Sequence, residues 1–355
     1  MKRKVCILLV LILCLTNVIG CVSYDSLGKL AFVNCIVLDV KDNKFVINYM
    51  VSNSNTASTN NAGKSFSIIT ADGKNIGECI DKAESQIEKK IFWGSLNCTV
   101  FSKKFLQNKT KLKEFLDFSE KDPLFDFSST VQALDAEADE FIQLFKDKEP
   151  QADEFMNMLI SKNPSKEYWQ TKYYTTIIKN GDFILPLIQL KDKMISYEGI
   201  GVIQNFEYKM KLNQDESGIY YMLTKEIVDA YTETPYGQVK ILSTRFAIED
   251  LDFSKIHYKL NLQCETITYK GKVLDKKTAT LIEKHLEREI EERCRLLWNK
   301  VQHKEKVDLF EMQEYLYKLK YKEYKQKEKE MNHIIPQIKL DIDVKADLKR
   351  SGITY

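Results

Sequence analysis

Two patterns of apolar residues alternate along the first half of the chain: continuous β-type runs and helical spacing. Continuous β-type runs predict strands at Leu30–Val40 and Lys44–Val51, with Lys41–Asn43 between them as the turn of a hairpin. Apolar residues three and four positions apart predict a helix over Asn75–Lys89. The same two patterns predict further strands at Ser65–Thr70, Ile91–Phe101, Ser128–Leu134 and Asp182–Leu190, and helices at Thr110–Ser119 and Ala136–Lys146. Polar composition predicts a loop at Ser52–Gly63 and a polar helical segment at Glu149–Gly181.

The second half is predicted to begin with strands, to continue with helices and to end with one further strand. A long amphipathic helix is expected over Lys277–Gln302, followed by a second helix after Asp308 and a half-buried strand at Pro336–Val344. The expected strands from Met194 onward are Gly199–Lys211, Gly218–Ile227, Val239–Ile248 and Ile256–Thr268. This order predicts an α+β fold of two to three small domains. The expected boundaries are 21–193 and 194–355, the latter with two possible lobes at 194–270 and 271–355.

The first twenty residues predict export. Three basic residues, Lys2 to Lys4, precede an apolar run at Val5–Leu15 that is too short to span a bilayer. Val18–Cys21 then has the form of a bacterial lipobox. We expect residues 1–20 to be removed and Cys21 to carry a diacylglyceryl group that holds the chain at the extracytoplasmic face of a membrane. The alternative is a plain secretory signal that has a cysteine at its boundary by chance.

Charge gives no reason to expect a nucleic-acid partner. Without Lys2, Arg3 and Lys4 the 53 basic residues become 50 against 51 acidic ones, a formal charge of −1. Tyr315–Lys329 interleaves aromatic residues with lysines, but its glutamates dilute the charge. We interpret it as a solvated helix face, and contact with anionic head groups is a weaker, compatible interpretation.

No catalytic constellation is evident. The four histidines have no metal-site spacing such as HExxH, and no GxSxG, P-loop or GxGxxG motif occurs. We therefore expect no enzymatic activity, no cofactor and no metal. Five cysteines follow Cys21, without CxxC spacing, and are interpreted mainly as small buried side chains, with one bridge among the first three left open: Cys35, Cys79, Cys98, Cys264 and Cys294.

Ordered short motifs along the chain resemble one family. The N-terminal motifs are Gly20-Cys21, Leu30–Val33, Leu38-Asp39, Thr70–Ile76, Lys90–Gly94 and Leu116–Pro123, and the C-terminal ones are Gly199–Ile203, Asp308–Phe310, Pro336–Val344 and Arg350–Gly352. In this order they resemble the Ger(x)C family of spore germination lipoproteins. The chain departs from the family pattern at Val22–Asp25, at Ser95–Cys98 and at Glu311–Gln313, where the family's glycines are missing.

The resemblance implies an α+β fold and a non-enzymatic role. It implies the C subunit of a nutrient germinant receptor, which supports receptor assembly and germination signalling with a multi-spanning A subunit and a transporter-like B subunit. The expected location is the inner membrane of the spore. The alternative function is a solute-binding lipoprotein that delivers a small molecule to a transporter. The predicted β-rich block from Met194 to Thr268 argues against that class, and a lipid-anchored hydrolase lacks a nucleophile constellation.

Overall fold

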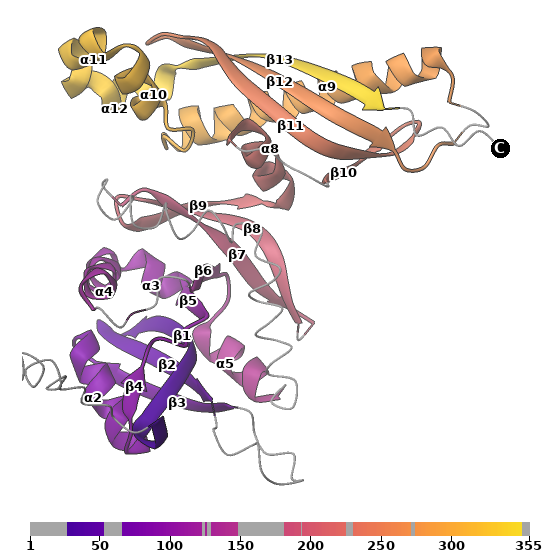
Figure 1. The fold of residues 1–355 in the computed structure, drawn as a ribbon. Coiled ribbons are helices and arrows are strands. Elements are labelled where there is room, and N and C mark those ends of the chain that lie inside the picture. The colour runs from indigo at the N-terminus through magenta and orange to yellow at the C-terminus, as the bar shows by residue number, and fades with distance from the viewer. Residues whose placement is uncertain are drawn as a thin grey trace, which may run out of the picture.

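The computed structural model describes residues 27–52, 66–122, 125, 129–147, 181–192, 194–224, 230–270 and 274–349. Within these residues a nine-stranded sheet and a four-stranded sheet, each covered by helices, form an α+β fold (Figure 1). The predicted fold class, with its long C-terminal helix, is therefore confirmed. Cys21, the predicted loop after Ser52 and the predicted helical segment from Glu149 to residue 180 lie outside the described residues.

The larger sheet has the strand order β3-β2-β1-β5-β6-β7-β8-β9, and β4 pairs with the start of β1. Its strands are β1 (Leu30–Lys41), β2 (Lys44–Ser52), β3 (Phe66–Gly73), β4 (Lys90–Phe92), β5 (Cys98–Ser102), β6 (Thr130–Leu134), β7 (Phe183–Lys191), β8 (Met194–Gln204) and β9 (Glu207–Asn213). Its helices are α2 (Ile76–Ile87), α3 (Lys103–Gln107), α4 (Lys109–Lys121) and α5 (Ala138–Asp147), after the short turn η1 (Leu27–Lys29).

The second part of the chain forms the four-stranded sheet, in the order β10-β11-β12-β13. It contains α8 (Gln214–Thr224), β10 (Ala230–Thr234), β11 (Gly237–Leu251), β12 (Lys255–Thr266), α9 (Lys276–Trp298), the π-helical turn η4 (Asn299–Lys304), α10 (Met312–Leu319), α11 (Tyr321–Lys327), η5 (Glu328–Glu330), α12 (Met331–Ile334), η6 (Ile335–Gln337) and β13 (Lys339–Lys349). The predicted long helix and the helix after Asp308 are thus confirmed.

The predicted hairpin at the start of the chain is present. Asp42 and Asn43 form its two-residue turn with positive φ angles of 51° and 57°. A primed two-residue turn of this kind matches the twist of the strands that it joins. Lys41 pairs with Lys44, and the antiparallel register then runs through the core of the sheet.

Helices cover both faces of this sheet. Residues of α2 and α4, among them Ala83 and Phe115, pack with β1 and β2 in one core. Phe141 and Phe145 of α5 pack with β1, β5 and β6 in a second core. The side chain of Asn75 accepts a hydrogen bond from the Glu78 amide and caps α2, which begins where the sequence predicted.

Two predicted single strands are wrong because each is interrupted. The predicted strand Ile91–Phe101 is divided into β4 and β5, with Gly94 in the turn between them. The predicted strand Gly199–Lys211 is the β8–β9 hairpin, whose turn residues Asn205 and Phe206 both have positive φ. The Asp182 carboxylate accepts a hydrogen bond from the Asn205 amide at 2.6 Å, so a distant segment stabilises the turn.

A third prediction is wrong in kind, because Gly218–Ile227 is not a strand. Its described residues belong to α8, and Asn213, just before the helix, caps it. The Glu216 amide donates to Asn213 Oδ1 and the Asn213 amide donates to Glu216 Oε2, both at 2.9 Å, which is a reciprocal capping box. The block from Met194 to Thr268 is therefore not all-β.

The last strand begins at Lys339, three residues later than predicted, because Ile335–Gln337 forms a 3-10 turn. β13 is an edge strand, and α9 closes its free side. Glu287 accepts a hydrogen bond from the Ala346 amide at 3.2 Å, and Glu283 accepts one from the Leu348 amide at 3.1 Å. Side chains that occupy edge amides remove a template for pairing with another chain.

The β7–β8 hairpin belongs to two cores at once. Leu185 and Leu187 pack in the core of the larger sheet, whereas Ile184 packs with α8, α9 and the smaller sheet. Successive residues of a strand point to opposite faces, so the hairpin joins the two parts of the molecule. The predicted boundary between residues 193 and 194 falls in its turn and stays a prediction.

Candidate functional site

The described residues include no candidate metal site. In the described parts of the chain, no three or more His, Cys, Asp or Glu side chains are grouped to hold a metal ion. No helix of these parts is both long and apolar enough to cross a membrane. Cys21, the predicted lipidation site, lies outside them and stays a prediction. The best-defined candidate is instead the region around Asp308, where α8, α9, α10 and β12 meet.

Asp308 sets the start of α10. Its carboxylate accepts hydrogen bonds from the amides of Met312 at 2.7 Å and Gln313 at 2.9 Å, two donors that the helix itself leaves free. The carboxyl group is half-buried. Burial raises its pKa to about 6, and the two amide hydrogen bonds act in the opposite direction. Asp308 therefore titrates much nearer to neutral pH than an ordinary aspartate.

An aromatic cluster lies beside Asp308. The indole of Trp298, at the end of α9, stacks on Phe310 with ring centroids 4.8 Å apart and an interplanar angle of 19°. Tyr258 of β12 meets Trp298 edge to face at 6.3 Å. The Trp298 indole donates a hydrogen bond to the Ile338 carbonyl at 2.9 Å. One side chain thus ties the long helix to β12, to the segment before α10 and to the entry of β13.

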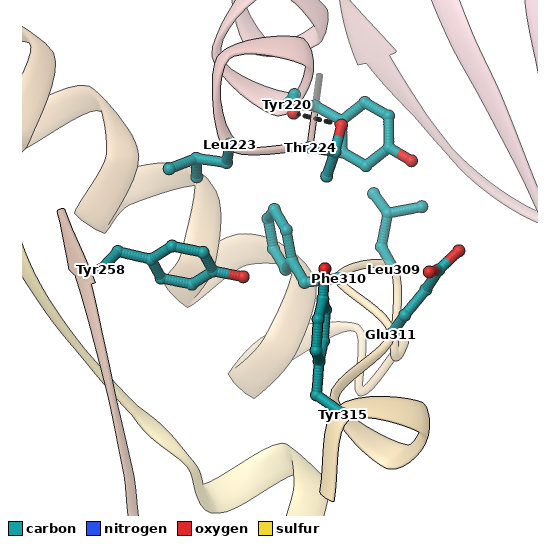
Figure 2. Close-up of a pocket in the computed structure, with 8 residues that line it drawn as sticks. All are labelled: Tyr220, Leu223, Thr224, Tyr258, Leu309, Phe310, Glu311 and Tyr315. Atoms are coloured by element: carbon teal, nitrogen blue, oxygen red, sulfur yellow. Dashed lines mark hydrogen bonds between the residues drawn. The ribbon is translucent and has the colours of Figure 1, made fainter. Parts of the chain in front are cut away.

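A small pocket opens next to this cluster (Figure 2). Tyr258 and Tyr315 direct their hydroxyl groups toward Phe310. The cavity has a volume of about 40 Å³, whereas ligand pockets usually measure roughly 300 to 1,000 Å³. It has room for a few water molecules rather than a nutrient. It is lined by Tyr220, Leu223, Thr224, Tyr258, Leu309, Phe310, Glu311 and Tyr315.

Ion pairs connect the neighbouring elements. Lys300 of η4 donates to both carboxylate oxygens of Glu216 at 2.7 Å, which ties α8 to the end of α9. On the larger sheet, Asp135 contacts Lys103 at 3.2 Å and Lys211 of β9 at 2.9 Å. Burial opposes ionisation of Asp135, but hydrogen bonds from Lys211 and Lys103 outweigh it and lower its pKa. These contacts fix β9 between the two parts of the molecule.

The five described cysteines carry free, buried thiols, as expected of small core side chains, and no bridge joins Cys35, Cys79 or Cys98. Cys35 and Cys98 are register partners on β1 and β5. A hydrogen bond with the Cys98 thiol, together with burial, raises the pKa of the Cys35 thiol well above its ordinary value. Burial also raises the pKa of Cys264 and of Cys294 to about 12. The thiols of Cys35, Cys264 and Cys294 are therefore poor nucleophiles at neutral pH.

Comparison with known proteins assigns the chain to a family. Residues 23–190 match the sequence model of the spore germination protein N-terminal domain, and residues 198–352 match that of the spore germination B3/GerAC-like C-terminal domain. The chain belongs to the Ger(x)C family of spore germination proteins. It is 23% identical over 407 residues to spore germination protein KC of Bacillus subtilis (strain 168). That alignment covers 99% of this chain and 97% of the relative.

A solved structure supports the fold of this family member. The crystal structure of the GerBC protein matches with a TM-score of 0.58 and 13% sequence identity, over 89% of this chain and 97% of that one. At this identity the likeness concerns the fold. The two-sheet arrangement and the long C-terminal helix are thus shared with the GerBC protein.

One departure from the family pattern has a structural consequence at the candidate site. Glu311 follows Asp308–Phe310, where the resemblance predicts glycine, and it has φ = 57° and ψ = 35°. This left-handed conformation costs a non-glycine residue roughly 1 to 2 kcal/mol. The chain therefore tolerates strain at the start of α10, where Asp308 holds the helix in place.

We expect Glu311→Gly to raise the free energy of unfolding by about 1 kcal/mol, because glycine adopts this conformation without the steric cost. Urea unfolding followed by circular dichroism measures the change. The matched control is Glu305→Gly, six residues earlier, where the backbone is right-handed helical with φ = −82°. That variant should lose stability by roughly 0.5 to 1 kcal/mol. Equal effects of the two substitutions would contradict the strain at Glu311.

Proposed function

We propose that this chain is the lipid-anchored, non-enzymatic C subunit of a spore nutrient-germinant receptor. Cys21 holds it at the extracytoplasmic face of the spore inner membrane, and it assembles there with membrane-embedded A and B subunits. Membership of the Ger(x)C family carries the proposal, since the two family domains together run from residue 23 to residue 352. The matched region begins two residues after Cys21, as expected if the mature chain starts at the lipobox cysteine.

The candidate site suits a subunit that works by contact. Around Asp308 the side chains cap a helix, stack aromatic rings and pair charges, and the cavity beside them is too small for a nutrient. The subunit's proposed contribution is a shaped surface on two joined sheets. Docking on A and B subunits would stabilise the assembled receptor, and the lipid would set the height of that surface above the membrane.

Release of dipicolinate from spores that lack the gene tests the proposal. The parent strain should also lack related receptor genes, so that no other receptor answers. We expect loss of the response to one class of nutrient, restored by the wild-type gene and not by Cys21→Ala. Cys264→Ala is the matched control, because it removes a thiol that is buried in the fold and should restore the response. Normal release to every nutrient without the gene would rule out the receptor role.

A second readout separates anchoring from signalling. Wild-type chain should appear in the membrane fraction and incorporate labelled fatty acid, whereas the Cys21→Ala chain should do neither. A Cys21→Ala chain that still incorporates fatty acid would contradict the anchor at this position.

A further inference from the structure

The turn between α10 and α11 concentrates exposed apolar surface. Of the eight large hydrophobic side chains that are exposed in the described residues, three lie within five positions: Tyr317, Leu319 and Tyr321, at 45%, 58% and 51% exposure. Lysines alternate with them, so the sequence Tyr317–Lys322 contains three basic residues and no acidic one. We name this segment the α10–α11 corner. Apolar side chains rarely gather on a surface that meets only water.

The exposed rings of the corner are held in place. Tyr317 packs edge to face against Tyr321 at 5.2 Å and against Tyr324 at 5.4 Å. Tyr324 is 4% exposed, and its hydroxyl accepts a hydrogen bond from Gln313 Nε2 at 3.0 Å. The corner is thus anchored in the core and presents Tyr321 outward at a fixed place. A preordered surface loses less entropy when it binds.

The charges of the corner favour an anionic partner. Lys318 pairs with Glu314 at 2.6 Å, and this contact offsets its charge. Lys325, which lies outside the corner, pairs with Glu328 at 2.9 Å. Lys320, which interacts with the Asp252 carboxylate, and Lys322 supply the remaining positive charge on either side of Tyr321. Tyrosine and lysine together suit the interface of a bilayer, where the ring lies among the head groups and the ammonium group reaches the phosphates.

We propose that the α10–α11 corner docks on an anionic lipid surface, as a second membrane contact in addition to the lipid on Cys21. Leu319 would enter the boundary of the acyl chains, Tyr317 and Tyr321 would lie at head-group level, and Lys320 and Lys322 would approach the phosphates. This docking proposal rests on the membrane location given in the proposed function. The docking surface itself consists of the exposed side chains of the corner.

Two contacts would fix the orientation of the chain. Leu27, the first described residue, is six positions after Cys21, and six residues span at most about 20 Å. β1 follows directly and lies in the lower sheet of Figure 1, whereas α10 and α11 lie at the opposite end of the molecule. A chain attached at both ends lies along the membrane, with its remaining surface available to partner subunits.

Sedimentation with vesicles tests the docking surface. The chain from residue 21, carrying Cys21→Ser so that no lipid contributes, is mixed with vesicles of phosphatidylcholine containing phosphatidylglycerol, or of phosphatidylcholine alone. We expect binding to the anionic vesicles that weakens with salt. Leu319→Ser together with Tyr321→Ser should lower the partition constant about tenfold or more. Lys320→Gln together with Lys322→Gln should lower it on the order of tenfold for anionic vesicles.

The controls are exposed residues of matched type elsewhere. Leu296→Ser together with Tyr231→Ser removes a leucine at 61% and a tyrosine at 59% exposure, and should leave binding unchanged. Lys345→Gln together with Lys349→Gln removes two exposed lysines of β13 and should also leave it unchanged. Thermal unfolding confirms that every variant folds.

Three outcomes would overturn the proposal: no binding to anionic vesicles, equal loss in the control variants, or a lipid-independent dimer that the corner variants abolish, since the partner would then be a second copy. The nutrient response of spores is scored separately. A chain that binds vesicles through the corner but has no role in germination contradicts the proposed function and leaves the docking surface in place.

Discussion

Trp298→Ala is expected to lower the free energy of unfolding by about 4 kcal/mol, a large fraction of the roughly 5 to 15 kcal/mol that a domain has. The side chain is 1% exposed, and its removal leaves a cavity between Phe310 and Tyr258. It also leaves the Ile338 carbonyl without the indole donor. Because the cluster joins α9, β12 and the entry of β13, the loss should spread through the smaller sheet.

Guanidinium unfolding measures this loss, and hydrogen exchange locates it. Peptides from β11, β12 and α9 should lose protection, whereas peptides from β1 and β5, which pack in separate cores, should keep it. Trp298→Phe should cost less, since a ring still stacks on Phe310 while the indole hydrogen bond is lost. Leu296→Ala, at an exposed position of the same helix, should change stability by no more than about 0.5 kcal/mol. A Trp298→Ala cost below about 1 kcal/mol would contradict the cluster.

Elements with a clear period and a local cap could be predicted from the sequence. The helix from Asn75 has an amphipathic face and its own N-cap residue, and α9 carries apolar residues at helical spacing over six turns. The β1–β2 hairpin has a turn of the residue types that positive φ favours. In each case the information lies within one stretch of sequence.

The prediction for α8 was wrong because its signals conflict. Buried residues lie all around α8, which packs between β8, β9, α9 and the smaller sheet, so no apolar stripe at helical spacing remains. These residues are Ile219, Tyr220, Met222 and Leu223. β-branched and aromatic residues then favour a strand by propensity alone. The Asn213–Glu216 capping box was the informative signal, because it marks the start of a helix.

The candidate site could be predicted only in part. The resemblance pointed to Asp308–Phe310, and the structure shows why the segment matters, since Asp308 starts α10 and Phe310 stacks on Trp298. Trp298 was missed, although it lies next to the predicted apolar face of α9. Its partner Tyr258 is 40 positions away in sequence, so only the pairing of β12 with the long helix brings the two rings together.

The pH dependence of stability should reveal the environment of Asp308. Its folded pKa of about 6 is above the ordinary value of about 3.9, so the stability that the neutral acid contributes is complete below about pH 3.9 and is lost as pH rises through about 6. Asp308→Asn cannot ionise and keeps the neutral form's oxygen for the Met312 amide. Between about pH 4.5 and about pH 7.5, the variant should therefore gain about 2 kcal/mol relative to wild type.

Asp252 supplies a control of opposite sign. Hydrogen bonds from the Ser254 hydroxyl and amide and from the Lys255 amide lower its pKa, so its contribution to stability is present above the ordinary value and lost only as pH falls through the folded pKa. Asp252→Asn should lower the free energy of unfolding by a similar amount at about pH 4.5 and at about pH 7.5. A pH-independent difference for Asp308→Asn would mean that the carboxylate is solvated. In that case the strained backbone of Glu311, rather than a buried charge, would be what lowers the free energy of unfolding at the start of α10.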